Sequence, residues 1–292
     1  MSERSKRRLK FSIVIPSWQE AQNLAALLPQ LCHVDHAETI VVEASADRQS
    51  ERIARECGAK FFRSHSANRG EQMNRGAQAT SGDVLIFQHA DSELTAAHLF
   101  SIDAVMQNPH IIGGAFYRKF DDRHARLRFL DWMARCRSRH GGMLFGDQSI
   151  FVRREVFQSL GGFAAIPLME DVEFSRRLRA SGQIVIIDPP VQTSARRHLR
   201  RGAWRTTIQN GAFLLLYKVG VSPKRLHRWY YQDRQSSQLP TEFASELMPA
   251  DRSARHSARS VSRNPLIVST RRSRARISSS LSSRASAPTQ TK

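Results

Sequence analysis

The chain has 292 residues, and its 45 lysines and arginines against 26 aspartates and glutamates give a formal net charge of +19. Hydrophobic residues make up 40% of it, which is enough for a sizeable core and excludes a wholly disordered chain. The apolar stretch 211–221 contains Lys218 and is too short to span a bilayer. The N-terminal run FSIVIP is likewise too short for the central region of a signal peptide. We therefore expect a cytoplasmic protein.

Composition divides the chain into three parts. Residues 1–10 (MSERSKRRLK) form a short basic arm, and residues 251–292 hold 12 serines and 9 arginines but no aromatic residue. A segment of that composition cannot bury enough apolar surface to offset its ordering entropy, so we expect a disordered tail over 234–292 and a folded domain over 11–233. Because the arm and the tail hold much of the positive charge, charge alone does not identify a nucleic-acid-binding protein, although that class stays open as an alternative.

Strands and helices alternate in the first half of the chain. Short apolar runs predict strands at 11–15, 39–43, 59–63 and 84–89. Apolar residues at helical spacing predict helices between them, at 20–31, 47–57 and 70–80. Such alternation is typical of βαβ units, so we predict an α/β fold: a single domain with a mainly parallel central sheet flanked by helices. Ligands of such sheets bind at the carboxyl ends of the strands, and here the ends at 16–20, 43–47 and 89–93 all carry acids.

The second half of the chain predicts a less regular order. Its expected strands are 111–119, 147–153 and 183–187, the last of them ended by Pro189 and Pro190. Its expected helices are an Arg-rich one up to about residue 137, then 154–160, 168–180 and 201–219. The 201–219 helix has an apolar face, for which two interpretations stay open. It is either a core-packing or lid helix, or a basic amphipathic helix that contacts a membrane surface.

The stretch LMEDVEFSRRL (168–178) places three carboxylates at the start of an expected helix. At helical spacing Asp171 shares a stripe with Phe174 and Leu178. Glu170 opens the same stripe, and Glu173 is expected to point outward. Acids in a first turn interact favourably with the helix dipole, by roughly 0.3–1 kcal/mol each, which accounts for Glu173. For Asp171 a second interpretation stands beside the first, because a partly desolvated carboxylate at a cleft wall has a raised pKa and can act as a general base.

Acids at the strand ends also allow two interpretations. Asp91 could hold a hard divalent cation together with phosphate oxygens, or it could cap the helix that follows. Glu43 could accept hydrogen bonds from a nucleobase or ribose, and Glu20 is similarly placed, whereas Asp47 is accounted for as a helix cap. His89 is more typical of a strand end than of a metal ligand.

Several short motifs follow one another along the chain. In the first half these are FSIVIP (11–16), Glu20, the acidic cluster 43–47, NRG (74–76), SGD (81–83) and HAD (89–91). Their order resembles that of the family 2 glycosyltransferases of GT-A type. Further motifs are RGEQMN (69–74), GDQSIFVRR (146–154), LGGF (160–163), LMEDVEFSRR (168–177) and TSARR (193–197). These are similar to the arsenosugar-biosynthesis branch of that family, and the resemblance covers about residues 11–231.

The resemblance implies a GT-A fold and the inverting transfer of a sugar from a nucleotide-sugar donor. It implies that Asp171 is the base for the acceptor hydroxyl, with Glu170 beside it at the acceptor mouth, and that Asp91 binds Mg²⁺ or Mn²⁺ at the diphosphate. The other implied site residues are the nucleotide-binding Pro16, Glu20, Glu43, Arg69 and Gln72, the acceptor-side Gly146, Asp147 and Gln148, and the phosphate-contacting Arg196 and Arg197.

The chain departs from the family pattern at three places. The family usually has DGxSxD where this chain has EASAD (43–47), Asn where Gln19 precedes Glu20, and Asp where this chain has His89. Only the last is usual for the branch. A longer acid and the stiffer Ala44 could weaken donor binding, so a degenerate fold that only binds is a further alternative.

The expected partners follow from the same resemblance and from the 196–221 region. They are a nucleotide-sugar donor and a small-molecule acceptor, with no specific nucleic acid. The alternative acceptor is a lipid such as a polyprenyl phosphate, with peripheral membrane contact through residues 196–221, because that region is both basic and apolar.

Overall fold

The computed structural model describes residues 8–122, 124–139 and 143–236, all within one compact unit that spans Met1–Leu239. Residues 1–7, 123, 140–142 and 237–292 lie outside the description, and with them most of the expected basic arm and the tail beyond residue 236. The expected division of the chain at residues 10 and 233 therefore stays a prediction.

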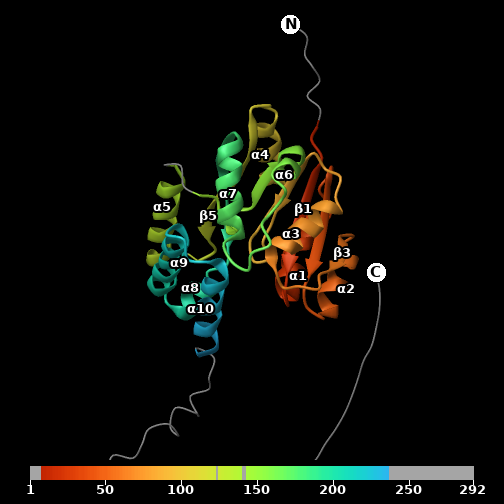
Figure 1. Ribbon diagram of the computed structural model, residues 1–292. Coiled ribbons are helices and arrows are strands. Elements are labelled where there is room, and N and C mark those ends of the chain that lie inside the picture. Colours follow the sequence, from red (N-terminus) through yellow and green to blue (C-terminus); the bar gives the residue numbers. More distant parts are fainter. Residues whose placement is uncertain (1–7, 123, 140–142, 237–292) are drawn as a thin grey trace, which may run out of the picture. The chain divides into compact units, whose positions relative to one another are not determined.

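In the described part of the chain, seven strands form a single sheet in the order β3-β2-β1-β4-β6-β5-β7 (Figure 1). Their bounds are β1 Phe11–Ser17, β2 Ala37–Glu43, β3 Lys60–Arg63, β4 Val84–Phe87, β5 Ile111–Phe120, β6 Ile150–Arg153 and β7 Gln183–Thr193. β1 pairs in parallel with β2 and β4, and β2 with β3. β6 runs antiparallel between β4 and β5, and β7 pairs in parallel with β5. The predicted α/β fold with a mainly parallel sheet is confirmed.

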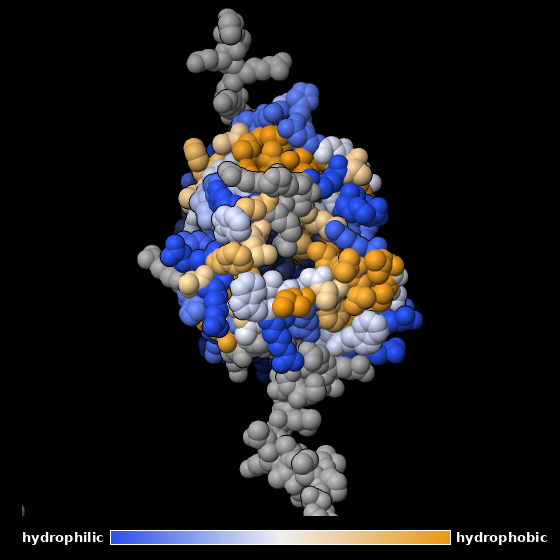
Figure 2. All heavy atoms as spheres, turned by 90° about the vertical axis from the view of Figure 1, so that its left-hand side faces the viewer, coloured by the Kyte–Doolittle hydropathy of each residue, from blue (hydrophilic) through white to orange (hydrophobic). Residues whose placement is uncertain are grey.

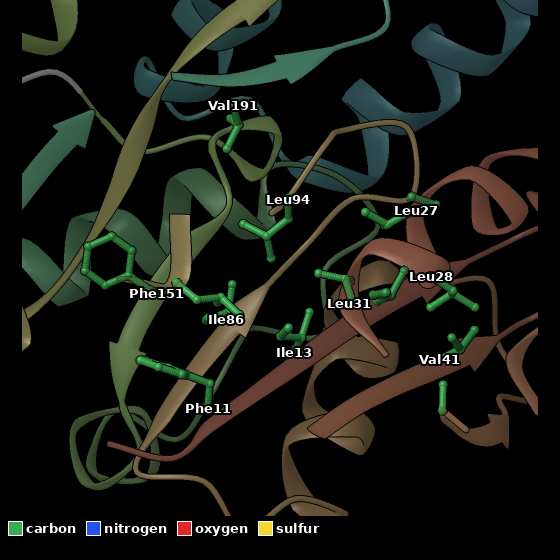
Figure 3. Close-up of a cluster of buried hydrophobic side chains, with 14 of the residues drawn as sticks. Phe11, Ile13, Leu27, Leu28, Leu31, Val41, Ile86, Leu94, Phe151 and Val191 are labelled. Carbon is green, nitrogen blue, oxygen red and sulfur yellow. The ribbon is translucent and has the colours of Figure 1, made fainter. Parts of the chain in front are cut away.

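Helices cover both faces of this sheet, as Figure 1 shows. Their bounds are α1 Ala21–Leu31, α2 Arg48–Glu56, α3 Arg69–Gln78, α4 Ala96–Met106, α5 Ala125–Arg139, α6 Arg154–Ser159, α7 Glu170–Ser181, α8 Arg196–Arg201, α9 Ala203–Lys218 and α10 Pro223–Ser236. Residues of α1, α2 and α4 share one buried cluster with Ile13 and Ile15 of β1. Figure 3 shows part of this cluster, with Ile13 of β1 and Leu27, Leu28 and Leu31 of α1 labelled. Residues of α3, α6 and α7 share a second cluster with Val14. Because successive strand residues point to opposite faces, β1 contributes to both clusters and is buried along its whole length.

The last strand is longer than expected. β7 continues through Pro189 and Pro190 to Thr193, although prolines were expected to end it. Among the described strands it lies at the edge of the sheet with β5 as its one neighbouring strand, so a missing proline N–H costs no second ladder. The prolines fall where the register with β5 shifts, between the pairs Phe116–Ile187 and Arg118–Val191. The edge position therefore explains why the proline rule failed here.

The segment before β6 is also not the strand that the sequence predicted. Gly146–Gln148 forms a single 3-10 turn, and Ser149 has a left-handed backbone with φ of 52°. β6 begins only at Ile150. The turn places the Gly146 backbone beside the start of α7 rather than in the sheet.

The helices α5, α8, α9 and α10 pack together beyond the edge of the sheet, with α8 against α9 and α9 against α10. Phe120, Leu127, Leu130 and Ala195 form a small third cluster there. On the apolar face predicted for the 201–219 helix, Trp204, Ile208 and Leu215 are 45%, 68% and 62% exposed, so these three side chains are not part of the core. Within the residues described, no helix combines the length and apolar character that crossing a membrane requires.

Candidate active site

The carboxyl ends of β1 and β2 are joined by Glu43. Its carboxylate accepts hydrogen bonds from the Ser17 hydroxyl (2.7 Å) and from the backbone N–H groups of Ser45 (2.8 Å) and Gln19 (3.3 Å). Glu43 is fully buried, and Gln19 has a left-handed backbone with φ of 57°. Glu43 therefore fixes the loops after both strands. Its predicted role in binding a nucleotide stays a prediction.

Gln72 and Pro16 lie behind the same edge of the sheet. The Gln72 amide donates to the backbone carbonyls of Ser17 (2.8 Å) and Val42 (2.7 Å), so α3 is tied to β1 and β2. Both Gln72 and Pro16 are buried. These two residues of the expected nucleotide-binding set support the strand ends from within.

Glu20 and Arg69 are the members of that set with solvent-exposed surface. Glu20 stands at the start of α1, is partly buried, and accepts a hydrogen bond from Asn23 of the first turn. The Arg69 side chain opens α3 and is 50% exposed. A ligand at this edge would meet these two side chains first.

Asp171 is the second residue of α7, and two backbone N–H groups hold its carboxylate. Gly146 donates to one oxygen and Val172 to the other, both at 2.8 Å. Gly146 leaves no room for a side chain, because a Cβ there would lie 2.5 Å from Nε2 of His89 and 3.5 Å from Oδ2 of Asp171. The structure thus brings together the turn predicted for the acceptor side, the predicted base and the end of β4.

A second carboxylate and an arginine adjoin Asp171. Glu170 is buried, with its side chain 4% exposed, and its Oε1 lies 3.3 Å from Nη1 of Arg69. Burial raises the pKa of Asp171 to about 6, and the negative charge of Glu170 adds to the rise. The hydrogen bond from Gly146 and the positive charge of Arg69 act in the opposite direction. A carboxylate with this pKa accepts a proton more readily than an ordinary aspartate and is still ionised at neutral pH.

The sequence predicted that Glu173 points outward, and that prediction is wrong. Its side chain is 16% exposed, and its carboxylate accepts a hydrogen bond from Nε of Arg177 at 2.7 Å. Arg177 also donates to the backbone carbonyls of Leu160 (2.5 Å) and Gly162 (2.7 Å). Glu173 therefore helps to hold α7 against the LGGF turn, in addition to its place at the helix start.

Asp91 lies in the loop after β4, partly buried. Its backbone carbonyl accepts the N–H of Ser194 at 3.1 Å, and the next residue, Ser92, bridges to Thr193, so the loops after β4 and β7 form one wall. Thr95 is the N-cap residue of α4, so Asp91 is not needed as a cap. An open cavity of about 230 Å³ lies beside this wall, lined by Asn23, Leu27, Asp91, Glu93, Thr193 and Ser194 among others.

The pKa of Arg69 is shifted by charged residues on both sides of the site. Burial acts to lower the pKa of Arg69, but Glu170, Asp171 and, more weakly, Asp91 raise it overall. The proposed base, its neighbour and the metal-ligand candidate therefore all lie within electrostatic reach of Arg69. This arrangement suits a negatively charged substrate group placed between the arginine and the Asp91 loop.

Asp91 is the residue that the resemblance assigns to a divalent cation, and Glu93 and Asp121 line the cavity beside it. Over the described residues, no three His, Cys, Asp or Glu side chains are grouped as a protein-only metal site would require. Asp91 lines this cavity and offers carboxylate oxygens. That donor set fits Mg²⁺ or Mn²⁺, which prefer oxygen ligands and commonly take several of them from substrate phosphates and water.

The acceptor-side turn has a partner that sequence reasoning did not single out. Gln148 is buried, and its Oε1 accepts the Phe145 N–H at 2.9 Å. Asp147 is partly exposed, and its Oδ2 lies 3.4 Å from Nε of Arg118 on β5. The Arg118 guanidinium stacks on the Phe120 ring, 4.0 Å from its centre. Local spacing gives no signal for Arg118, because the pair joins two distant segments.

The expected phosphate-contacting arginines start α8. Arg196 is exposed, and its backbone N–H lies 3.4 Å from the Ser194 hydroxyl, close to the wall that includes Asp91. The side chain of Arg197 lies outside the description.

Three aromatic residues next to the site also carried no sequence signal. Trp18 follows β1 and is 56% exposed. Burial raises the pKa of the Tyr217 phenol on α9, and the charges of Glu173 and Asp171 contribute, so α9 stands beside the proposed base. The charge interaction with Tyr231 of α10 contributes to the raised pKa of Arg69, so α10 also lies near the site.

The sheet order, the acids at the strand ends and the carboxylate pair at the start of α7 together define a protein of the GT-A class. Residues 12–161, a little over half of the chain, match the glycosyl transferase family 2 profile. The chain belongs to that family.

Relatives and solved structures agree with this assignment. Over 105 residues the chain is 32% identical to the 4,4'-diaponeurosporenoate glycosyltransferase of Staphylococcus haemolyticus (strain JCSC1435), covering 33% of this chain and 28% of that protein. The chain thus spans little more than a quarter of this curated relative.

Among solved structures, the mannosyltransferase PcManGT from Pyrobaculum calidifontis, in complex with GDP-Man and Mn²⁺, has a TM-score of 0.54. It is 17% identical, and the match covers 74% of this chain and 66% of that one. TarS 1-349 of S. aureus has a TM-score of 0.52 at 15% identity, with 64% of this chain and 60% of that one covered. At these identities the likeness shows the fold alone.

Proposed function

We propose that the protein is an inverting glycosyltransferase that moves a sugar from a nucleotide-sugar donor to an acceptor hydroxyl. The observation that carries the proposal is the Asp171 carboxylate, which is held by Gly146 and Val172 and has a pKa raised to about 6. It opens onto the same edge of the sheet as Arg69 and the Asp91 loop. The names of the similar proteins, which specify glycosyl and mannosyl transfer, support the activity.

Asp171 is the base in this proposal. Its carboxylate takes the proton of the acceptor hydroxyl while that oxygen forms a bond to the anomeric carbon and the bond from that carbon to the diphosphate oxygen breaks. The electron pair of the broken bond leaves with the nucleoside diphosphate. Because attack and departure are in line, the configuration at the anomeric carbon inverts. The bonds from Gly146 and Val172 keep the carboxylate from rotating away, and Glu170 raises its proton affinity.

The residues on the donor side of the site would bind the negatively charged diphosphate. Asp91 would hold Mg²⁺ or Mn²⁺, which when bound neutralises charge on the diphosphate. Arg69, whose charge interacts with those of Asp171 and Asp91, would bind a phosphate oxygen, and Arg196 and Arg197 at the start of α8 would approach the leaving group. Glu43 and Gln72 act indirectly, by fixing the loops that hold the nucleotide.

The acceptor is the finer part of the proposal. Gly146, Asp147 and Gln148 would line its side of the site, next to Asp171. The resemblance of the 146–177 motifs to the arsenosugar-biosynthesis branch supports a small-molecule acceptor. A lipid acceptor such as a polyprenyl phosphate is the alternative, favoured by the exposed apolar residues of α9.

The proposal is tested with a panel of UDP- and GDP-sugars in the presence of Mn²⁺, measuring release of the nucleoside diphosphate. We expect turnover with at least one donor and a loss of about 10²-fold or more in Asp171→Asn, as for removal of a general base. Glu155→Gln is the matched control, since Glu155 is likewise the second residue of a helix, α6, but is exposed and remote from the site.

The two interpretations of Asp171 give different outcomes. If Asp171 serves only the helix start, Asp171→Asn and Glu155→Gln change turnover equally little, and the base assignment is wrong. If wild type neither binds nor consumes any donor, the transferase proposal fails and a degenerate binding protein takes its place.

A further inference from the structure

Exposed apolar side chains gather on one side of the described domain. They are Phe129, Trp132 and Met133 of α5 and Trp204, Ile208 and Leu215 of α9, and we call these six residues the apolar face. Each is between 42% and 68% exposed. Figure 2 views the molecule from the side on which α5 and α9 lie in Figure 1 and shows broad orange areas next to strongly blue ones.

Ring contacts join α5 to α9 within the apolar face, and its residues on α9 are regularly spaced. The Phe129 ring lies 5.7 Å from the rings of both Trp132 and Trp204, so α5 and α9 contribute to one surface. On α9, residues 204, 208 and 215 fall within about 40° of the helix circumference at 100° per residue. Two exposed cations, Arg205 and Lys218, flank this stripe on either side. A stripe of this kind on a solvent-facing side is typical of a helix that lies in an interface.

Charge is concentrated around the same face. Residues 125–139 and 196–236, which form α5 and α8–α10, hold fifteen lysines and arginines against Asp131 and Asp233, a net charge of +13. The rest of residues 11–239 holds fifteen basic and twenty acidic residues, a net charge of −5. Asp131 is turned inward, where its carboxylate accepts the Phe120 N–H at 3.2 Å. The helices that carry the face are therefore strongly cationic in net charge, while the rest of residues 11–239 is net negative.

We propose that the apolar face binds the surface of an anionic phospholipid bilayer. Tryptophan is favoured at the headgroup level, aliphatic side chains gain free energy on entering the acyl boundary, and each lysine or arginine near an anionic leaflet is attracted to it. A second copy of this chain fits less well, because a two-fold dimer through this face would bring two cationic surfaces together. A nucleic acid would use the cations but not Ile208, Leu215 or Met133.

The side of α9 opposite to the apolar face lies toward the candidate active site. Tyr217 lies on the side of α9 opposite to residues 204, 208 and 215, and it senses the charges of Glu173 and Asp171. One helix thus faces the bilayer with one side and the proposed base with the other. Contact through the apolar face would place the site close to the lipid surface, within reach of an acceptor held there.

The test is flotation of the full chain with vesicles, in the absence of donor and acceptor, so that its outcome does not depend on the proposed transferase activity. The vesicles are phosphatidylcholine alone, or phosphatidylcholine with 30 mol% phosphatidylglycerol (about one lipid in three). We expect binding to the anionic vesicles and about tenfold or weaker binding to the neutral ones. Brominated lipid chains should quench the tryptophan fluorescence of the bound protein.

Ile208→Asp with Leu215→Asp is the decisive variant, and Phe100→Asp on α4 is its matched control, since Phe100 is 76% exposed and far from the face in sequence. We expect the double variant to lose about tenfold or more in vesicle affinity and to lose the quenching, with an unchanged circular dichroism spectrum, while the control binds like wild type. Equal binding by wild type and the double variant would overturn the proposal. So would a wild-type dimer that the double variant abolishes, or preferential binding of single-stranded RNA through this face.

Discussion

The pKa of Asp171 sets an expectation for the pH dependence of the reaction. Burial and then the charge of Glu170 raise that pKa to about 6, and a base works only when it is deprotonated. We expect kcat/KM to fall about tenfold per pH unit below pH 6 and to level off above it. The measurement is donor turnover from pH 4.5 to 8.5.

The neighbours of Asp171 should move this acidic limb in opposite directions. Glu170→Gln removes a negative charge that raises the pKa of Asp171, so the limb should move to lower pH. Arg69→Gln removes a positive charge that lowers it, so the limb should move to higher pH. Glu155→Gln should leave the limb where it is. A limb that ignores both substitutions would mean that another group titrates.

For the individual site residues, the sequence predicted which side chains matter but not which residues they contact. Asp171 stood out because a carboxylate opened an apolar helical stripe, and Asp91 because it followed a strand. The pairing of Glu170 with Arg69 joins residues 101 positions apart, and no local period reports a contact of that range. Glu43 was singled out by its place at a strand end, but its burial was not predicted, because only the fold brings together the two loops that pack around it.

Among the elements, Glu38 holds three strands and a turn at one corner of the sheet. Its carboxylate on β2 accepts hydrogen bonds from Ser12 of β1 (2.8 Å), Lys60 of β3 (2.8 Å) and the Ser81 backbone N–H (2.6 Å). Burial acts to raise its pKa, but these bonds prevail and lower it to about 2. A group whose folded-state pKa is depressed stabilises the fold above its unfolded pKa and loses that contribution as the pH falls through the folded value.

Glu38→Gln should therefore reduce the free energy of unfolding near neutral pH, by about 1–3 kcal/mol. The difference from wild type should shrink as the pH falls from about 4.5 towards 2. Urea titrations at a series of pH values check this. Glu56→Gln is the control, because Glu56 is 65% exposed and pairs only loosely with Arg52, at 3.6 Å. A difference that is constant with pH would show that Glu38 acts by packing and not by charge.

The elements that the sequence predicted well are the strands of the central sheet and the helices that are buried directly against it. The four parallel strands and the helices between them follow from apolar runs and helical spacing. The predicted end of β7 came too early, because the rule that proline ends a strand assumes a neighbouring strand on each side. An edge strand has a neighbour on one side only. For the apolar face of α9 two interpretations stayed open, since periodicity shows which side of a helix is apolar but not what covers that side.

For the whole molecule, the net charge of +19 has separate sources. Residues 240–292 hold nine arginines and one lysine against Glu242, Glu246 and Asp251, a net charge of +7. The α5 and α8–α10 helices hold +13, and the rest of residues 11–239 is net negative. A basic tail attracts any polyanion in a salt-dependent way, without a structured site. The tail is therefore expected to add salt-sensitive polyanion binding to that of the full chain without supplying a specific site.

Removal of residues 240–292 tests this division of charge. The compact unit Met1–Leu239 contains the sheet, both large clusters and the site, so we expect the shortened chain to fold and to melt within a few degrees of the full chain. Fluorescence anisotropy with a short RNA should show weak, salt-sensitive binding by the full chain and about tenfold weaker binding by the shortened one. Donor turnover should be unchanged. If the shortened chain bound RNA tightly while its donor turnover was absent, the positive charge of the α5 and α8–α10 helices would be a nucleic-acid site, and the transferase proposal would give way to that alternative.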